Sequence, residues 1–262
     1  MAATQQDKYK RRIMENVAVI GAGLMGHGIA QIFAFKGFSV TMMDIRKDTL
    51  ISALENIRKN LNLFKEEGII DEKHVPLVLE RIQPGTDINE TVKGKTFVFE
   101  AISENLKLKQ QLFKELDTVC TAETILATNT SVISINEIAA LAEDQSRILG
   151  THFWNPPYLI PLVEVVPGDF TTDEVVDRAV KVLHKVGKHP VRVNRDVPGF
   201  VGNRLQHALW REAISIVEQG IADASTVDDC IKYGFGLRLP VLGPMENSDM
   251  VGTDLTLAIH EY

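Results

Sequence analysis

The sequence predicts an α/β protein with a doubly wound, mostly parallel sheet, followed by a smaller all-helical C-terminal domain. Three observations predict this architecture. Short apolar runs alternate with amphipathic segments from residue 17 to residue 193, a pattern typical of parallel strands joined by helical crossovers. A glycine-rich turn directly follows the first apolar run. Beyond that region the pattern is helical only, which indicates a second domain.

The first strand and helix enclose a turn with G-x-G-x-x-G spacing. Val17 to Ile20 are the predicted strand, and Leu24 to Phe35 are the predicted helix. Glycines at these positions allow a tight turn, a close approach to a pyrophosphate, and close packing of helix on strand. The helix N-terminus adds unpaired N–H donors for the phosphates. The order therefore predicts a Rossmann-type dinucleotide site, which comprises Gly21, Gly23, Leu24, Met25 and Gly26.

An acidic residue follows the second predicted strand. Ser39 to Met43 form that strand, and Asp44 comes directly after it. A carboxylate at this position accepts hydrogen bonds from the ribose hydroxyls and repels a 2′-phosphate. The sequence therefore predicts NAD, in preference to NADP, as the cofactor.

The remaining elements follow from apolar periodicity. A helix over Lys47 to Glu67 and a second helical stretch over Asp71 to Arg81 form a long excursion, interpreted either as a substrate-facing antenna or as a simple helical insert. The helix after Glu104 is expected to bury Leu108, Leu112, Phe113, Leu116 and Val119. Other predicted strands are Thr96–Ile102, Thr124–Ala127, Ile148–Phe153, Leu162–Val166 and Pro190–Val193, and other predicted helices are Ile135–Ala142 and Asp173–Val186.

Proline and glycine in Asp196 to Gly199 mark the expected domain boundary. We predict a flexible leader over 1–14, an NAD-binding domain over 15–196 and a helical domain over 197–262. In the last, Phe200 to Gln219 are expected to be helical, and Ser225 is expected to cap a helix over Thr226 to Tyr233. A helical domain of this size has marginal stability alone, and we therefore expect it to pack on a partner subunit or on the first domain.

Composition limits the classes of function. The net charge of −7 argues against broad nucleic-acid binding. Cys120 and Cys230 lack metal-ligand spacing, so they are interpreted as reduced thiols of a cytoplasmic protein, and no metal site is predicted. No apolar run is long enough to span a bilayer, and the first residues lack the apolar region of a secretory signal.

A histidine and a glutamate are the candidates for chemistry. His152 ends a predicted strand, where its side chain can face a cleft and take a hydroxyl proton. Glu164 lies within the apolar run LVEVV, where an unpaired carboxylate is costly, so it needs a partner such as His152. A buried structural histidine and an edge-strand glutamate are an equally weighted alternative. The polar cluster Thr128 to Ser131 ends another strand, where ligands of open α/β sheets bind.

Five segments in order, GAGLMG with Asp44, SENLKLK, ATNTSV, HFWNPPYLIPLVEVV and DVPGFVGNRL, resemble the 3-hydroxyacyl-CoA dehydrogenase family. The resemblance implies a homodimeric enzyme of fatty acid metabolism, which oxidises a 3-hydroxyacyl-CoA with NAD, and whose C-terminal domain forms the dimer. It implies that His152 is the base, that Glu164 is its partner and that Ser131 contacts the substrate oxygen. It also implies active-site roles for Asn203 and Asn155, and cofactor contacts from Glu104, Lys109, Ser131 and Asn155.

Some features depart from the CoA-using members. Asn155 to Pro161 and Gly236 to Pro240 look more like relatives that oxidise free hydroxy acids, such as gulonate and carnitine dehydrogenases. Glu66 and Glu67 stand where CoA-users tend to place lysines, and two acids repel CoA phosphates. The chain also ends at Tyr262, short of the final helices usual in the family.

These departures leave alternatives open. The first is an NAD-dependent dehydrogenase of a free 3-hydroxy acid. Another is the 3-hydroxyisobutyrate and 6-phosphogluconate type of dehydrogenase, which shares the methionine of the glycine turn but uses a lysine base. A third is a non-catalytic, crystallin-like member, although both His152 and Glu164 are present.

Overall fold

The structure, a computed structural model, describes residues 15–262, and the expected flexible leader over 1–14 lies outside the described residues. The chain divides into two compact units. The first ends at Val201 and contains the sheet, and the second runs from Gly202 to Tyr262 and is helical.

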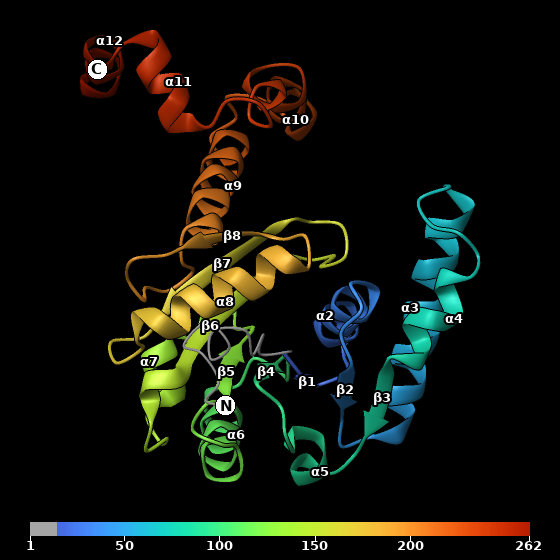
Figure 1. The fold of residues 1–262 in the computed structure, drawn as a ribbon. Helices are drawn as coiled ribbons and strands as arrows, with labels where there is room; N and C mark the ends of the chain where they lie inside the picture. Colours follow the sequence, from blue (N-terminus) through green and yellow to red (C-terminus); the bar gives the residue numbers. More distant parts are fainter. Residues whose placement is uncertain (1–14) are drawn as a thin grey trace, which may run out of the picture. The chain divides into compact units, whose positions relative to one another are not determined.

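A single sheet organises the first unit (Figure 1). Its eight strands within the described residues lie in the order β3-β2-β1-β4-β5-β6-β7-β8. Every neighbouring pair is parallel except β6 and β7, which are antiparallel. The mostly parallel, doubly wound sheet is therefore confirmed. The strands are β1 (Val17–Ile20), β2 (Val40–Met43), β3 (Ile82–Gly85), β4 (Phe97–Glu100), β5 (Ile125–Thr128), β6 (Ile148–Phe153), β7 (Leu162–Pro167) and β8 (His189–Arg192).

Helices cover both faces of this sheet (Figure 1). One core contains apolar side chains of α2, α3, α4 and α8, and the other contains those of α6 and α7. In β1, Val17 and Val19 face the first core while Ala18 and Ile20 face the second, because successive strand residues point to opposite faces. The helices are α2 (Leu24–Phe35), α3 (Lys47–Glu66), α4 (His74–Glu80), α5 (Ile88–Val92), α6 (Leu106–Val119), α7 (Ile135–Ala139) and α8 (Asp173–Lys185).

Two elements between Arg81 and Lys93 were not expected from the sequence. Strand β3 contains proline and glycine, which read as a turn, but it lies at the sheet edge beside β2, where Pro84 is tolerated. Helix α5 is a single short turn capped by the Asp87 side chain, which accepts from the Glu90 N–H. Of the two elements, α5 contributes Ile88 and Asn89 to the pocket beside the glycine turn.

The buried face of α6 also differs from the expectation. Leu108 and Val119 are exposed, whereas Phe113 and Leu116 are buried as expected. Lys109 takes a place in the interior instead, because two carboxylates surround its ammonium group. Apolar spacing could not show this, since the partners of Lys109 come from other segments.

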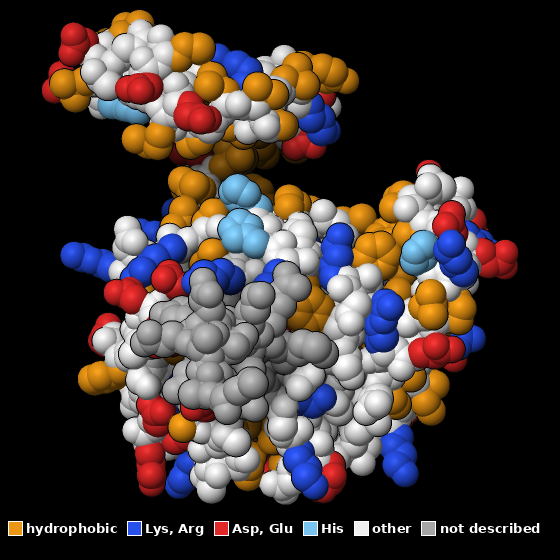
Figure 2. Space-filling model, viewed as in Figure 1, with side chains coloured by type: hydrophobic (Ala, Val, Ile, Leu, Met, Phe, Trp, Pro, Cys, Tyr) orange, Lys and Arg blue, Asp and Glu red, His pale blue; other side chains and the backbone are white. Residues whose placement is uncertain are grey.

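The second unit consists of helices with no buried residue in any of them. Figure 2 shows many hydrophobic side chains on its surface. Leu205, Trp210 and Ile214 are among its exposed large hydrophobic residues. Asp223, not Ser225, caps α10, since its side chain accepts from the Thr226 N–H at 2.7 Å. Across the described residues no helix is both long and apolar enough to cross a membrane. The helices are α9 (Gly202–Glu218), α10 (Ala224–Lys232), α11 (Pro244–Val251) and α12 (Thr253–Glu261).

Candidate active site

The glycine turn between β1 and α2 is too crowded for side chains at two positions. Gly21 has a φ of +95°, and a Cβ there would lie 2.6 Å from the Ala101 carbonyl oxygen. A Cβ on Gly26 would lie 1.7 Å from the carbonyl oxygen of Gly21. Helix and strand therefore approach as closely as a dinucleotide site requires.

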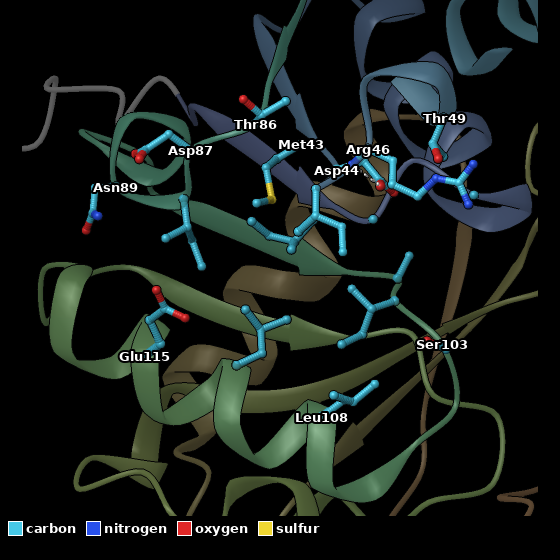
Figure 3. A pocket seen from close by; sticks show the side chains of 18 residues that line it. Met43, Asp44, Arg46, Thr49, Thr86, Asp87, Asn89, Ser103, Leu108 and Glu115 are labelled. Carbon is cyan, nitrogen blue, oxygen red and sulfur yellow. Dashed lines mark hydrogen bonds between the residues drawn. The ribbon is translucent and has the colours of Figure 1, made fainter. Parts of the chain in front are cut away.

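A pocket of about 760 Å³ opens beside this turn (Figure 3). It lies where the sheet order reverses, between β2, β1 and β4, which is the place for ligands in open α/β sheets. Ile45, Ile102 and Leu108 supply apolar walls, so the exposure of Leu108 follows from its place at the pocket. Thr49, Thr86, Asp87, Asn89 and Ser103 supply polar groups.

Asp44 is tied to the glycine turn by its own carboxylate. Its Oδ2 accepts from the Ala22 N–H at 3.1 Å, and its Oδ1 accepts from the Arg46 N–H at 3.0 Å. The carboxylate therefore lies at the pocket wall, where ribose hydroxyls can donate to its remaining lone pairs.

The start of α2 fits the phosphates of a dinucleotide. Gly23 caps the helix without a side-chain hydrogen bond, so the first N–H groups of the helix remain available to a ligand. A Cβ on Gly23 would have nothing within 4 Å, which leaves open space above the turn. Leu24 is 67% exposed and Met25 partly buried in this first turn. The residues present therefore fit NAD.

His152 and Glu164 lie directly opposite each other on the antiparallel strands β6 and β7. His152 Nδ1 is 2.8 Å from Glu164 Oε2, and the two residues are 5% and 1% exposed. The second oxygen, Oε1, accepts from the Val201 N–H at 2.9 Å. Glu164 is not on an edge strand, because β8 lies beyond β7. A proton held on Nδ1 by the carboxylate makes Nε2 the basic nitrogen of the ring.

Two aromatic rings flank the histidine. The Trp154 and Phe200 rings lie 5.4 and 5.7 Å from the His152 ring, centroid to centroid. Phe200 is buried with a φ of +47°, a rare conformation for a bulky residue that costs energy and marks functional sites. Reasoning from the sequence missed Phe200, although its place after Pro198 and Gly199 in the specific PGF block was a usable signal.

Glu104 holds the loop that follows β5. Its Oε1 accepts from Thr130 Oγ1 at 2.5 Å, from the Ser131 N–H at 2.9 Å and from the Val132 N–H at 3.3 Å. Partial burial alone would raise the pKa of Glu104, but these donors hold that pKa below its usual value. The ionised carboxylate thus fixes the backbone of Ser131.

Lys109 lies behind this loop, between two carboxylates. Its Nζ is 2.6 Å from Glu100 Oε1 and 3.4 Å from Glu104 Oε2, and the residue is 1% exposed. Glu100 Oε2 also accepts from Thr128 Oγ1 at 2.6 Å, at the end of β5. Glu100 was not recognised from the sequence, although an acid inside the apolar run TFVFEAI has the same signature as Glu164.

The predicted site residues thus fall into separate groups. His152 and Glu164 are in contact, and Glu104 contacts both Lys109 and the Ser131 backbone on the neighbouring strand ends. Gly21, Gly23 and Asp44 line the pocket beside the glycine turn. Asn155 is exposed just after β6, and Asn203 belongs to the second unit, at the start of α9. Within 15–262 no group of three potential metal ligands is arranged to hold an ion.

Comparison with known proteins covers nearly the whole chain. Residues 16–197 match the family model of the 3-hydroxyacyl-CoA dehydrogenase NAD binding domain. Residues 199–262 match the model of the C-terminal domain of the same family.

Individual relatives have different names. A probable 3-hydroxybutyryl-CoA dehydrogenase of Bacillus subtilis is 38% identical over 248 residues, which cover 95% of this chain and 85% of that protein. The human lambda-crystallin homolog is 37% identical over 231 residues, which cover 88% and 72%. A 5-formyl-3-hydroxy-2-methylpyridine 4-carboxylate 5-dehydrogenase of Mesorhizobium japonicum is 33% identical, with coverage of 95% and 80%. A crystal structure of an enzyme with that activity gives a TM-score of 0.86 at 32% identity and the same coverage.

Proposed function

Because the chain belongs to the 3-hydroxyacyl-CoA dehydrogenase family, we propose that His152 is the base in a reversible, NAD-dependent oxidation of a 3-hydroxyacyl-CoA to the 3-oxoacyl-CoA. The observation that carries the assignment is the buried contact of His152 Nδ1 with Glu164 at 2.8 Å. A histidine held in one tautomer at a strand end, in the sheet that also carries the dinucleotide pocket, has the arrangement that alcohol oxidation needs.

The chemistry divides between cofactor and protein. Bound NAD supplies the hydride acceptor at its nicotinamide ring. His152 Nε2 takes the proton of the 3-hydroxyl and returns it in the reverse direction. Glu164 keeps the ring in the productive tautomer and stabilises the imidazolium that forms.

Further residues of the proposed site bind substrate and cofactor. Ser131 and Asn203 donate hydrogen bonds to the substrate oxygen as it gains carbonyl character. Glu104 supports this role, since it fixes the Ser131 backbone. We assign the nicotinamide side to Glu104, Lys109, Ser131 and Asn155, and the rest of the cofactor to Gly21, Gly23, Leu24, Met25, Gly26 and Asp44. Residues 15–196 form the NAD-binding domain and residues 197–262 the C-terminal domain in this proposal.

A direct assay of substrates tests the proposal. The enzyme is given NAD with 3-hydroxybutyryl-CoA, gulonate or carnitine in parallel, and NADH formation is followed. We expect a clearly higher kcat/KM for the thioester. A protein that is active with the free acids and inactive with the thioester would contradict the substrate assignment and leave the dehydrogenase chemistry intact.

A free hydroxy acid is the second candidate substrate. The name of the Mesorhizobium japonicum relative describes a pyridine carboxylate and not a CoA thioester. Glu66 and Glu67, at the end of α3, are exposed and carry the charge that CoA phosphates avoid. A crystallin-like role without catalysis is the third candidate, favoured by the lambda-crystallin homolog. The intact His152–Glu164 contact argues against it.

We also propose that the enzyme is a homodimer of the cytoplasm that serves fatty acid metabolism. Exposed apolar side chains along α9, at Leu205, Leu209 and Ile214, support a helical surface that a second copy covers. The free cysteines Cys120 and Cys230 suit a reducing compartment. Light scattering of the purified protein is expected to give the mass of a dimer, and a monomer at all concentrations would contradict this.

A further inference from the structure

The loop between β6 and β7 begins beside the catalytic histidine and carries Asn155. We propose that Lys188 is a positioning residue for this loop, and that together with Gly28 it sets where Asn155 lies relative to the cofactor helix α2. The inference rests on the function proposed above and names a residue for which that function provides no role.

Lys188, the residue directly before β8, reaches the loop. Its Nζ donates to the carbonyl oxygens of Pro157 and, at 2.7 Å, of Ile160. The residue is only 8% exposed, and burial lowers the pKa of its ammonium group to about 8. No carboxylate within the described residues pairs with it, whereas buried lysines are usually paired with an acid. The two loop carbonyls are therefore what the buried amine binds.

The loop also packs on α2. A Cβ on Gly28 would lie 2.5 Å from Pro157 Cγ and 3.4 Å from Tyr158 Cδ1, so only glycine allows this approach. The Tyr158 ring also meets the Phe64 ring of α3 at 6.1 Å between centroids. Pro157 thus contacts Lys188 through its carbonyl oxygen and α2 through its ring.

Backbone hydrogen bonds within the loop and to β8 make the loop a rigid segment. The N–H groups of Leu159 and Ile160 both donate to the Pro156 carbonyl oxygen at 3.0 Å. The His189 N–H, next to Lys188, donates to the Pro161 carbonyl oxygen at 2.8 Å. A displacement of Pro157 is therefore passed to Asn155 two residues earlier, and from there toward His152.

Removal of the Lys188 amine is expected to affect the loop and catalysis more than cofactor binding. The buried carbonyl of Pro157 and the partly buried carbonyl of Ile160 lose their donor, which is costly for a polar group shielded from water. The loop then relaxes away from α2, so Asn155 is misplaced during the reaction. The adenosine pocket shares no residue with this loop, so NAD affinity is expected to fall only by the contribution of Asn155, and by less than kcat.

The experiment compares Lys188→Met with Lys181→Met, an exposed lysine of the adjacent α8. Hydrogen exchange is measured by mass spectrometry on peptides that cover residues 154–161, and kcat, KM and NAD affinity are measured on the same proteins. For Lys188→Met we expect faster exchange confined to the loop and a kcat reduced roughly ten- to a hundred-fold, as for a misplaced catalytic group. Lys181→Met is expected to match the wild type in every readout.

Gly28→Ala is the second variant, because its methyl group would displace the Pro157 ring. Because both residues act on Pro157, the double variant should lose less kcat than the product of the single losses. Unchanged loop exchange in Lys188→Met, or faster exchange with an unchanged kcat, would overturn the proposal. A wild type inactive on every substrate would contradict the proposed function alone, and the exchange data would still decide whether Lys188 fixes the loop.

Discussion

Replacement of Glu164 by glutamine tests the histidine–carboxylate pair without a change in size. In the wild type, Oε2 accepts from His152 Nδ1 and Oε1 accepts from the Val201 N–H. A glutamine can keep its oxygen on Val201 only if its NH₂ group faces His152. That NH₂ donates to Nδ1 and so places the ring proton on Nε2, which is the wrong tautomer for a base.

The size of the effect follows from the contact distance. A unit charge 2.8 Å from Nδ1 stabilises a full imidazolium by about 6 kcal/mol at an effective dielectric constant of about 20. With about half of the proton transferred in the transition state, the loss is about 3 kcal/mol, or roughly a hundred-fold in kcat. The wrong tautomer adds to this, so the expected loss lies between about a hundred-fold and ten-thousand-fold.

The assay follows NADH formation from 3-hydroxybutyryl-CoA, with NAD binding and thermal unfolding measured beside it. Glu174→Gln, an exposed acid on α8, is the matched control and should retain wild-type activity. A Glu164→Gln enzyme that folds, binds NAD and loses less than about tenfold in kcat would refute the role of the carboxylate.

Three further outcomes are expected. Asp44→Ala should raise the KM for NAD by about tenfold or more, because the ribose hydroxyls lose a charged acceptor. It should also lower the ratio of kcat/KM for NAD to kcat/KM for NADP, and an unchanged ratio would contradict the role of Asp44. In the folded protein the pKa of the Lys188 ammonium group is about 8, whereas the ordinary pKa of a lysine is 10.5. Between pH 8 and 10.5 this side chain is therefore protonated in the unfolded chain and largely neutral in the folded protein. The wild-type free energy of unfolding should therefore rise with pH across that window relative to Lys188→Met, as measured by denaturant titration. Burial raises the pKa of Cys120 to about 11, so a thiol reagent should modify the exposed Cys230 first. Equal rates of modification of the two cysteines would contradict the packing around Cys120.

Much of the fold could be predicted because parallel strands buried on both faces leave continuous apolar runs in the sequence. Strand β6 was predicted with the bounds Ile148–Phe153 that the structure has. The edge strand β3 was not, because its residues IQPG lack that signature and its pairing depends on β2, which lies far away in the chain. Local pattern therefore identifies buried strands better than edge strands.

In the candidate site, too, features with a local sequence signature were predicted and features that depend on distant segments were not. The cost of burying an unpaired carboxylate was enough to suggest a partner for Glu164, and the structure places His152 beside it. The resemblance implied a cofactor contact for Lys109, but its buried pairing with Glu100 was not predicted, and Lys188 was not noticed. The groups that surround each lysine come from distant segments. Phe200 depends on a backbone conformation that no spacing rule contains.

Whether His152 is the base is tested most directly by the rate of NADH formation from 3-hydroxybutyryl-CoA in the wild type and in His152→Gln, with NAD affinity measured on both. We expect the wild type to turn over and the variant to lose roughly a thousand-fold or more in kcat at unchanged NAD affinity, as for loss of a general base. A variant that keeps most of its turnover would show that His152 is not the base.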